Sequence, residues 1–597
     1  MIRDKSNIPE TAARVKAVIK QGYCRLPGPV LAGVLSALLV WWLIPLVWPA
    51  LQRSRGFERM QEEKYLLVLP FTNPAGDPAS RAFCNGLVET LSSKLSQMEQ
   101  LQKSLRVVPA ADVLESRVAG AGEALQEFGV NLVVDAGMQR FENSFSLSLN
   151  LVDTETLQQL SSEVITVRTA DFAALQEGMV EKLAEMLDLE LPPESRLLMT
   201  AGGTKVPQAY EFYLQALGHL QSYREDENLE TAINMFEQAV GEDSVYASAC
   251  AGLGKACWCK YETTRDSYWM QRASQHCKRA AELNELLAAA HVTLGMIHEE
   301  TGLHDEAVKE FRLALELDPA DISAYRKLAD AYIAQGRFLL AELTYQKAIE
   351  LNPHNCVSYG YLGAFYRDQG RYEDAAAQFH RAVQVNPMYA KGFGSLGGVY
   401  FLLGRRQDAE QMYLRSLEIR PSWQAYSNLA SCYFYQERYE DAASVYEKAL
   451  EKDSTDYRIW ANLAAAYYWI ADEQESSRYS YRHAIILAEE ELRHRPGDQK
   501  LLNDLALYCA TIGEREKTQA VLQQLVDSEP DILDVVIGVG YIYEVLGERE
   551  LALKWIEKAL EKEDYALMEI ESFPGLEELR EDERFQVLVR RFADKTD

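Results

Sequence analysis

The fold is decided by the stretch CVSYGYLGAFYRDQGRYEDAAAQFHRAVQVNP, which occupies residues 356–387. Large apolar residues fall three and four positions apart in both halves of the stretch, which predicts two helices with one apolar face each. Gly370 stands where the first helix must end, and the small Ala375 and Ala382 allow the two helices to pack closely. The stretch therefore predicts a hairpin of two helices.

This hairpin belongs to a series, because a proline recurs every 34 residues between Ala288 and Pro421. The four prolines are Pro319, Pro353, Pro387 and Pro421. A fixed period of this length is typical of a solenoid, in which each hairpin buries its apolar face against its neighbours. Extending the register in both directions gives about ten units over residues 207–563, so we expect a mainly α fold.

The residues within one unit carry a resemblance to a known repeat. Positions 4, 7, 8, 11, 15, 17, 20, 24, 27 and 32 of the unit hold Tyr359, Leu362, Gly363, Tyr366, Gly370, Tyr372, Ala375, Phe379, Ala382 and Pro387. This pattern is similar to the tetratricopeptide repeat. The resemblance implies an α-solenoid that binds other proteins or peptides, with the first helix of each unit lining a concave face.

Two units depart from the 34-residue period. Ser244 and Glu285, which stand at equivalent positions, are 41 residues apart, and Ser454 and Pro496 are 42 apart. The additional residues fall around positions 260–269 and 472–480. We expect both insertions to lie in turns.

Composition limits the possible partners. The 597 residues carry a formal charge of −29, so the bulk surface would repel the phosphates of nucleic acids and of anionic lipids. An apolar content of 48% is enough for several cores. We therefore expect a protein partner and no nucleic acid, and the sequence leaves the oligomeric state open.

An uncharged run of 22 residues follows a short basic segment at residues 1–29. The run covers residues 30–51 and would be about 33 Å long as a helix, which matches the hydrocarbon core of a bilayer. We expect one transmembrane helix; the alternatives are a cleaved signal peptide and a buried core helix. Basic residues also follow the run, at Arg53, Arg55, Arg59 and Lys64, and nearly match those before it; on total count we expect residues 1–29 to lie in the cytoplasm. We thus expect a single-pass inner (cytoplasmic) membrane protein whose C-terminal domains are periplasmic or extracytoplasmic.

Residues 64–191 read as a small α/β domain. Strand patterns at 65–70, 105–108, 131–138, 144–152 and 163–167 are interspersed with helical patterns at 79–95 and 171–187. Residues 144–151 alternate strictly between polar and apolar, which predicts a half-buried strand. We expect a mixed sheet, then a linker at 192–206, the repeats at 207–563 and a capping helix at 564–597.

A second resemblance rests on segments of this α/β region. They are Leu67-Val68-Leu69-Pro70-Phe71 with Gly76-Asp77, Phe83-Cys84-Asn85-Gly86-Leu87, Leu105-Arg106-Val107-Val108, and Gly129-Val130-Asn131-Leu132-Val133 leading to Leu149-Asn150-Leu151-Val152-Asp153. Together they resemble the TolB amino-terminal-like domain. In bacteria, this domain followed by tetratricopeptide repeats is common in the membrane-distal part of eukaryotic-like Ser/Thr kinases, CadC-type regulators and related adenylate cyclases.

The sequence offers no residues for catalysis, a metal or a cofactor. His298-Glu299-Glu300 with His304 differs from a zinc protease motif, because the second histidine falls six residues after the first rather than four. Cys257, Cys259 and Cys277 lack the paired spacing of a zinc site, and Cys257 and Cys277 stand where the repeat buries apolar side chains. Glycine-rich phosphate loops and kinase motifs are also missing, so we expect no enzymatic activity.

The candidate site is the concave groove. Asn428 and Asn462 stand at position 6 of successive units, and by resemblance to peptide-binding relatives they would hydrogen-bond the backbone of an extended peptide. Position 2 supplies Lys391 and Arg458. Positions 12 and 13 supply five aromatic residues, which either pack between neighbouring helix ends or anchor a peptide: Phe401, Phe434, Tyr435, Tyr468 and Trp469.

Two hypotheses for function follow. The first is a membrane-anchored adaptor or sensor in signal transduction, which binds proteins or peptides in the concave groove. The second is the sensor portion of a receptor kinase or transcription regulator, either truncated or paired with a separately encoded effector.

Overall fold

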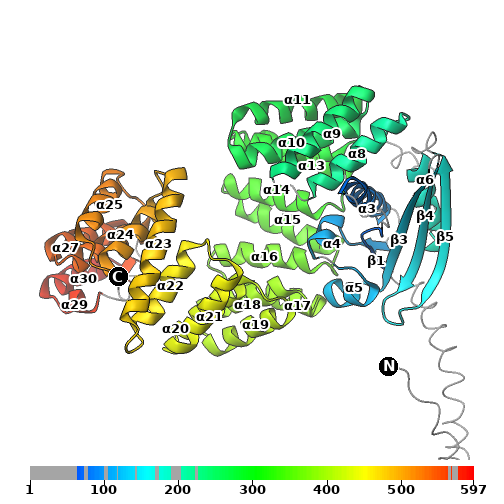
Figure 1. Ribbon diagram of the computed structural model, residues 1–597. Coiled ribbons are helices and arrows are strands. Elements are labelled where there is room, and N and C mark those ends of the chain that lie inside the picture. Colours follow the sequence, from blue (N-terminus) through cyan, green and yellow to red (C-terminus); the bar gives the residue numbers. More distant parts are fainter. Residues whose placement is uncertain are drawn as a thin grey trace, which may run out of the picture. The chain divides into compact units, whose positions relative to one another are not determined.

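A computed structural model describes residues 64–72, 78–99, 105–116, 118–141, 144–168, 174–189, 203–221, 226–562, 566–567, 570 and 576–596. The chain divides into two compact units, Met1–Thr344 and Tyr345–Asp597. The structure is mainly helical, with one small sheet near the N-terminus (Figure 1). The predicted basic segment (1–29), membrane helix (30–51) and residues 192–202 of the linker lie outside the described residues. None of the described helices combines the length and apolarity needed to cross a membrane.

The five-stranded sheet has the order β2-β1-β3-β4-β5. Strand β1 (Lys64–Val68) pairs in parallel with β2 (Leu105–Val107) and β3 (Leu132–Phe141). Strand β4 (Ser144–Asp153) pairs antiparallel with β3 and with β5 (Gln159–Arg168). The predicted mixed sheet is therefore present, and β4 alternates along its length between buried and half-buried side chains, as its sequence predicts.

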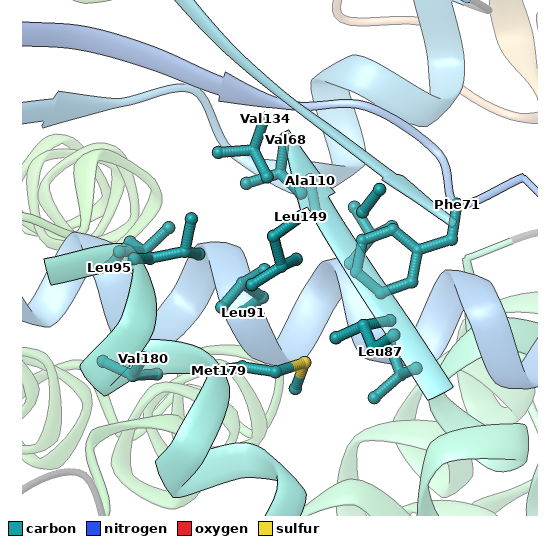
Figure 2. Close-up of a cluster of buried hydrophobic side chains, with 14 of the residues drawn as sticks. Val68, Phe71, Leu87, Leu91, Leu95, Ala110, Val134, Leu149, Met179 and Val180 are labelled. Carbon is teal, nitrogen blue, oxygen red and sulfur yellow. The ribbon is translucent and has the colours of Figure 1, made fainter. Parts of the chain in front are cut away.

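Helices cover one face of this sheet, and two short helices cover part of the other face. Helix α3 (Pro78–Glu99) and α6 (Ala174–Met186) pack on one face, where Leu91 and Leu95 of α3 meet Val68, Leu149 and other buried residues (Figure 2). The short helices α4 (Ala110–Ser116) and α5 (Ala121–Phe128) contribute to a separate core that includes Leu67 of β1. Strand β1 is covered on both faces, which explains its continuous apolar run.

The first helix of the repeats completes the core of the sheet domain. Helix α8 (Pro207–Leu220) crosses α3 so closely that a Cβ atom at Gly86 would lie 1.9 Å from the carbonyl oxygen of Leu214. A Cβ atom at Gly218 would lie 1.8 Å from the carbonyl oxygen of Ala82. Both glycines thus allow backbone contact between the helices, and Leu214 enters the same core as Phe83 and Leu87.

Within the described residues, twenty helices from α8 to α27 form ten hairpins, in agreement with the expected number of repeats. They are α8, α9 (Asp226–Glu242), α10 (Ala247–Thr264), α11 (Ser267–Leu283), α12 (Ala288–Glu300), α13 (His304–Leu317), α14 (Ile322–Ala334), α15 (Phe338–Leu351), α16 (Cys356–Asp368), α17 (Tyr372–Val385), α18 (Ala390–Leu402), α19 (Arg406–Ile419), α20 (Trp423–Phe434), α21 (Tyr439–Lys452), α22 (Tyr457–Tyr468), α23 (Gln474–His494), α24 (Gln499–Thr511), α25 (Arg515–Asp527), α26 (Leu533–Val545) and α27 (Arg549–Lys562).

The hairpin α16–α17 shows the local causes of this structure. The side chain of Asn355 accepts a hydrogen bond from the backbone N–H of Ser358 at 3.0 Å and caps α16. Gly370 has a φ of 71°, a left-handed conformation that suits glycine and ends the helix. A Cβ atom at Gly363 would lie 3.0 Å from the ring of Phe379, so a small residue is needed where the helices pack.

The prediction that both insertions lie in turns is wrong. In the hairpin α10–α11 the additional residues lengthen both helices, to 18 and 17 residues, and only residues 265–266 separate them. In the second case α23 has 21 residues against 14 in α21. Ser477, Tyr481 and Ala484 follow the start of α23 at the spacing that Ala442, Tyr446 and Ala449 have in α21, so the extra turns lie at the C-terminal end of α23. The inserted residues continue a helical pattern of apolar residues, which makes a longer helix possible.

The last hairpin is covered by two more helices, α29 (Glu577–Arg580) and α30 (Glu583–Thr596). Leu576, Leu579 and Phe585 are buried in one core with residues of α26 and α27. The apolar face that another repeat would cover is closed in this way.

Candidate protein-binding surface

The two predicted asparagines lie on equivalent helices. Asn428 is in α20 and Asn462 is in α22, and both side chains are exposed. Tyr435 and Trp469 follow the asparagines by seven residues each, which places them on the same helix face about 10 Å further along. An amide and an aromatic ring therefore recur together on two neighbouring repeats.

Arg458 occupies the start of α22, four residues before Asn462 and on the same face. Its guanidinium pairs with Asp456 at 2.6 Å, and the Asp456 side chain also accepts the backbone N–H of Arg458 at 2.9 Å. Burial acts to raise the pKa of Asp456, but the hydrogen bonds from Arg458 outweigh this effect and lower it. The structure thus holds Arg458 against the capping residue of its own helix. Lys391 is exposed near the start of α18.

The five predicted aromatic residues are brought together, and Tyr439 joins them. The ring centroids are separated by 5.3 Å between Phe401 and Tyr435, 5.6 Å between Phe434 and Tyr435, and 5.4 Å between Phe434 and Tyr439. Tyr439 stacks on Trp469 at 5.7 Å, and Trp469 contacts Tyr468 at 5.6 Å. We call these six residues the aromatic cluster.

The two interpretations of these aromatic residues, packing between helix ends and exposure for binding, apply to different residues of the five. Phe401 and Phe434 are half-buried and pack against the core of these repeats. Tyr435, Tyr468 and Trp469 are 51%, 57% and 60% exposed. The two phenylalanines support the cluster, and the other three side chains can contact a partner.

Sequence reasoning missed two residues of this surface. Tyr439 stands at the start of α21, in the position that Tyr372 occupies in its own repeat, and the repeat pattern alone could have identified it. The guanidinium of Arg406 lies 5.7 Å from the ring centroids of both Phe401 and Tyr435. It adds a positive charge to the edge of the aromatic cluster.

The surface does not continue into the next repeat. At the position of Asn462, α24 has Asp504, whose carboxylate accepts a hydrogen bond from the Tyr457 hydroxyl at 3.1 Å. Burial raises the pKa of Asp504, with smaller opposing effects from its partners. In α26 the equivalent residue is Gly538, where a Cβ atom would lie 2.3 Å from the Asn503 side chain. The paired amides are therefore a local feature of α20 and α22.

The other sequence candidates for chemistry are dispersed. His298 lies in α12 and His304 begins α13. Among the described residues, no group of three His, Cys, Asp or Glu side chains is placed to hold a metal ion. Burial raises the pKa of the Cys257 and Cys259 thiols to about 11 and that of Cys277 to about 12. These thiols are placed as core residues.

Comparison with known proteins bears on the repeats. Six family models of the tetratricopeptide repeat match this chain. The matched stretches overlap or adjoin one another and together run from residue 288 to residue 491. Residues 288–491 are tetratricopeptide repeats. Such repeats bind other proteins or peptides, so this part of the chain is a protein-binding part.

Similar solved structures include a thermophilic TPR protein of Thermus thermophilus, which is 28% identical and covers 30% of this chain and 98% of its own, with a TM-score of 0.26. PilF of Pseudomonas aeruginosa is 21% identical over 35% of this chain and 93% of its own, with a TM-score of 0.28. YrrB, described as a TPR protein with an unusual peptide-binding site, is 22% identical over 32% of this chain and 95% of its own, with a TM-score of 0.24.

A curated relative is putative adenylate cyclase 3 of Rhizobium meliloti (strain 1021), which is 23% identical over 188 residues. The match covers 32% of this chain and 32% of the relative, so this chain spans about a third of that protein's length. At this identity and coverage the relative's name does not establish catalysis here. The resemblance of residues 64–191 to the TolB-like domain stays a prediction.

Proposed function

We propose that the chain captures an extended segment of a partner protein on the exposed faces of α18, α20 and α22. Asn428 and Asn462 would hydrogen-bond the backbone of the segment, while Tyr435, Tyr468 and Trp469 would contact its apolar side chains. The observation that carries this proposal is the repetition of an exposed amide and an exposed ring, seven residues apart, on two neighbouring helices.

The physical advantage of this arrangement is preorganisation. Neither asparagine side chain forms a hydrogen bond with the described residues, so no internal bond has to break before a peptide binds. The exposed rings are held by contacts with Phe434 and Tyr439. Binding would therefore cost little side-chain entropy on this side of the interface.

The proposal also includes anchoring in a membrane. The apolar run at residues 30–51 supports anchoring in the inner membrane, with residues 1–29 in the cytoplasm and the repeats on the other side. In this setting the protein acts as an adaptor or sensor without catalytic output of its own. The alternative, favoured by the resemblance to CadC-type regulators and receptor kinases, is a sensor portion that works with a separate effector.

Site-specific photocrosslinking tests the binding surface. A photoreactive phenylalanine analogue replaces Trp469 in the full chain, and in a separate protein it replaces Tyr268, which is similarly exposed at 55% but lies in α11. We expect a discrete crosslinked partner from position 469 and none from position 268. Combining the probe with Asn428→Ala and Asn462→Ala should remove the crosslink while leaving helix content unchanged.

The proposal fails if both positions crosslink equally, or if the double alanine variant keeps its partner. Phe434→Ala is a poor test, because this half-buried ring supports the core. Proteinase accessibility of the repeats in cells with a permeabilised outer membrane and an intact inner membrane tests the membrane orientation separately. Complete protection of the repeats in such cells would contradict an extracytoplasmic location.

A further inference from the structure

A second feature of the repeats is an arginine that stacks on a tyrosine of its own hairpin. The arginine precedes the second helix of the hairpin, and the tyrosine lies five residues earlier, near the end of the first helix. Four hairpins in a row share it, with distances from the guanidinium carbon to the ring centroid of 5.4 Å for Arg337 and Tyr332, 4.1 Å for Arg371 and Tyr366, 4.2 Å for Arg405 and Tyr400, and 3.9 Å for Arg438 and Tyr433.

The next hairpin, α22–α23, has the same tyrosine, but acidic residues stand where the other hairpins have the arginine. Tyr467 is the equivalent ring, but Asp472 follows it by five residues and Glu473 is the residue that precedes α23. Within the described residues no cation lies over Tyr467. Its hydroxyl instead donates a hydrogen bond to the Glu447 carboxylate at 2.6 Å.

Tyr467 lines a pocket of about 650 Å³ between α21, α22 and α23. Trp460, Tyr467 and Tyr479 provide aromatic surface, and Leu450 and Leu463 provide aliphatic surface. Three carboxylates also line the pocket, from Glu447, Glu451 and Glu475, and none of the lining residues is basic. The pocket thus combines aromatic rings with net negative charge.

The rings of the pocket are fixed by their neighbours. The Trp460 indole N–H donates a hydrogen bond to the backbone carbonyl of Ser454 at 2.9 Å. The imidazole of His483 stacks on Trp460 with ring centroids 4.6 Å apart, and Tyr479 contacts the same imidazole edge to face at 4.5 Å. A ligand would therefore meet a preformed aromatic wall.

This pocket is separate from the surface proposed above. Trp460 and Asn462 are two residues apart in α22, which turns their side chains about 200° from one another around the helix axis. Tyr467 lies seven residues after Trp460 and shares its face, whereas Trp469 shares the face of Asn462. Helix α22 consequently presents two different surfaces on nearly opposite sides.

We propose that the pocket binds the guanidinium group of an arginine in a basic segment of a partner protein. A guanidinium can stack on an aromatic ring with its flat face and pair with carboxylates through its edge. The four preceding hairpins make the same ring contact with their own arginines. In α22–α23 the partner supplies that arginine, and the three glutamates supply the opposite charge.

The probe is a fluorescein-labelled nonapeptide of three Gly-Ser-Arg triplets, and its binding to the full chain is followed by fluorescence anisotropy. Two matched peptides replace every arginine by lysine or by the neutral isostere citrulline. We expect the arginine peptide to bind about fivefold more tightly than the lysine peptide, because the ammonium cannot stack and pair at once, and the citrulline peptide not to bind. Equal binding of the arginine and lysine peptides would overturn the proposal.

Two charge-reversal variants locate the binding. Glu473→Arg restores the arginine of the other hairpins beside Tyr467 and should weaken binding at least about tenfold by occupying the ring. Glu490→Arg makes the same change of charge at an exposed position near the far end of α23 and should keep more than half of the affinity. If the two variants weaken binding equally, the interaction is a general charge effect and the proposal is wrong. Thermal unfolding of both variants, compared with that of the native chain, checks that they are folded.

Discussion

The first hairpin of the repeats and the hairpin α20–α21 have the same two-helix design but differ in the surroundings of their first helix. In the first hairpin, Gly86 and Gly218 let α3 and α8 approach until their backbones touch, and Leu214 is part of the core of the sheet domain. In α20–α21 the first helix and its C-cap carry Asn428 and Tyr435, which are exposed and occupy the positions of Phe212 and His219 in α8. Both hairpins have the same backbone design, and in the function proposed above their surface residues determine whether a repeat completes the fold or binds a partner.

This difference has an energetic side. A buried junction is sensitive to one added methyl group, because close-packed backbone cannot move aside. An exposed face loses little when a side chain is shortened, because water replaces the lost contacts. Mutations in the two hairpins should therefore separate stability from binding, and the predictions below run from the largest expected change in stability to the smallest.

Gly218→Ala should give the largest change in stability. The added Cβ atom would lie 1.8 Å from the carbonyl oxygen of Ala82, so α8 must move away from α3, which we expect to cost about 3 kcal/mol of the free energy of unfolding. Urea unfolding followed by circular dichroism measures this cost. Gly241→Ala is the matched control, because no atom lies within 4 Å of its added Cβ atom in α9. The control should be unchanged or slightly more stable, and equal losses in the two variants would contradict the close crossing.

Lys94 of α3 makes the stability of the N-terminal domain depend on pH. Burial in α3 lowers the pKa of Lys94 to about 8 from its usual 10.5, so the folded chain loses this proton at a lower pH than the unfolded chain. Between these two values the unfolded chain binds more protons, and stability must rise with pH by at most about 1.4 kcal/mol per pH unit from this group. We expect the native chain to gain stability between pH 8 and pH 10 relative to Lys94→Met. A constant difference between the two proteins over this range would show that Lys94 keeps its usual pKa.

Trp469→Ala should change stability least. The ring is 60% exposed and its main fixed contact is the stack on Tyr439, so we expect a loss of about 1 kcal/mol or less in the free energy of unfolding. The same substitution should abolish the crosslink formed from a probe at Tyr435. A loss as large as that of Gly218→Ala would mean that the aromatic cluster is a core element rather than a binding surface.

Much of the repeat architecture could be predicted from sequence because its causes are local. The proline period, Gly370 and the small Ala375 and Ala382 each act within one hairpin, and the structure has the expected helices around them. The prediction for the two insertions was wrong because the repeat period shows only that residues have been added. It does not show whether those residues continue a helix. The short helices α4 and α5 were missed because seven or eight residues carry little periodic signal.

The features that sequence could not provide involve residues far apart in the chain. Gln221 donates a hydrogen bond to Glu89 across 132 residues of sequence, and the contact of Gly86 with Leu214 is of the same kind. The aromatic cluster was found in part because its members recur at fixed positions. Arg406 was missed because its stacking depends on how two successive repeats are rotated against one another.

The contribution of α8 to the sheet domain has a consequence for how this chain could be dissected or recombined. A fragment that stops before residue 207 would leave the α3 surface around Gly86 open to water, and we expect such a fragment to be poorly soluble. The smallest portable piece of the N-terminal region therefore carries α8 and α9 with it, and a foreign set of repeats would be grafted successfully only after that hairpin.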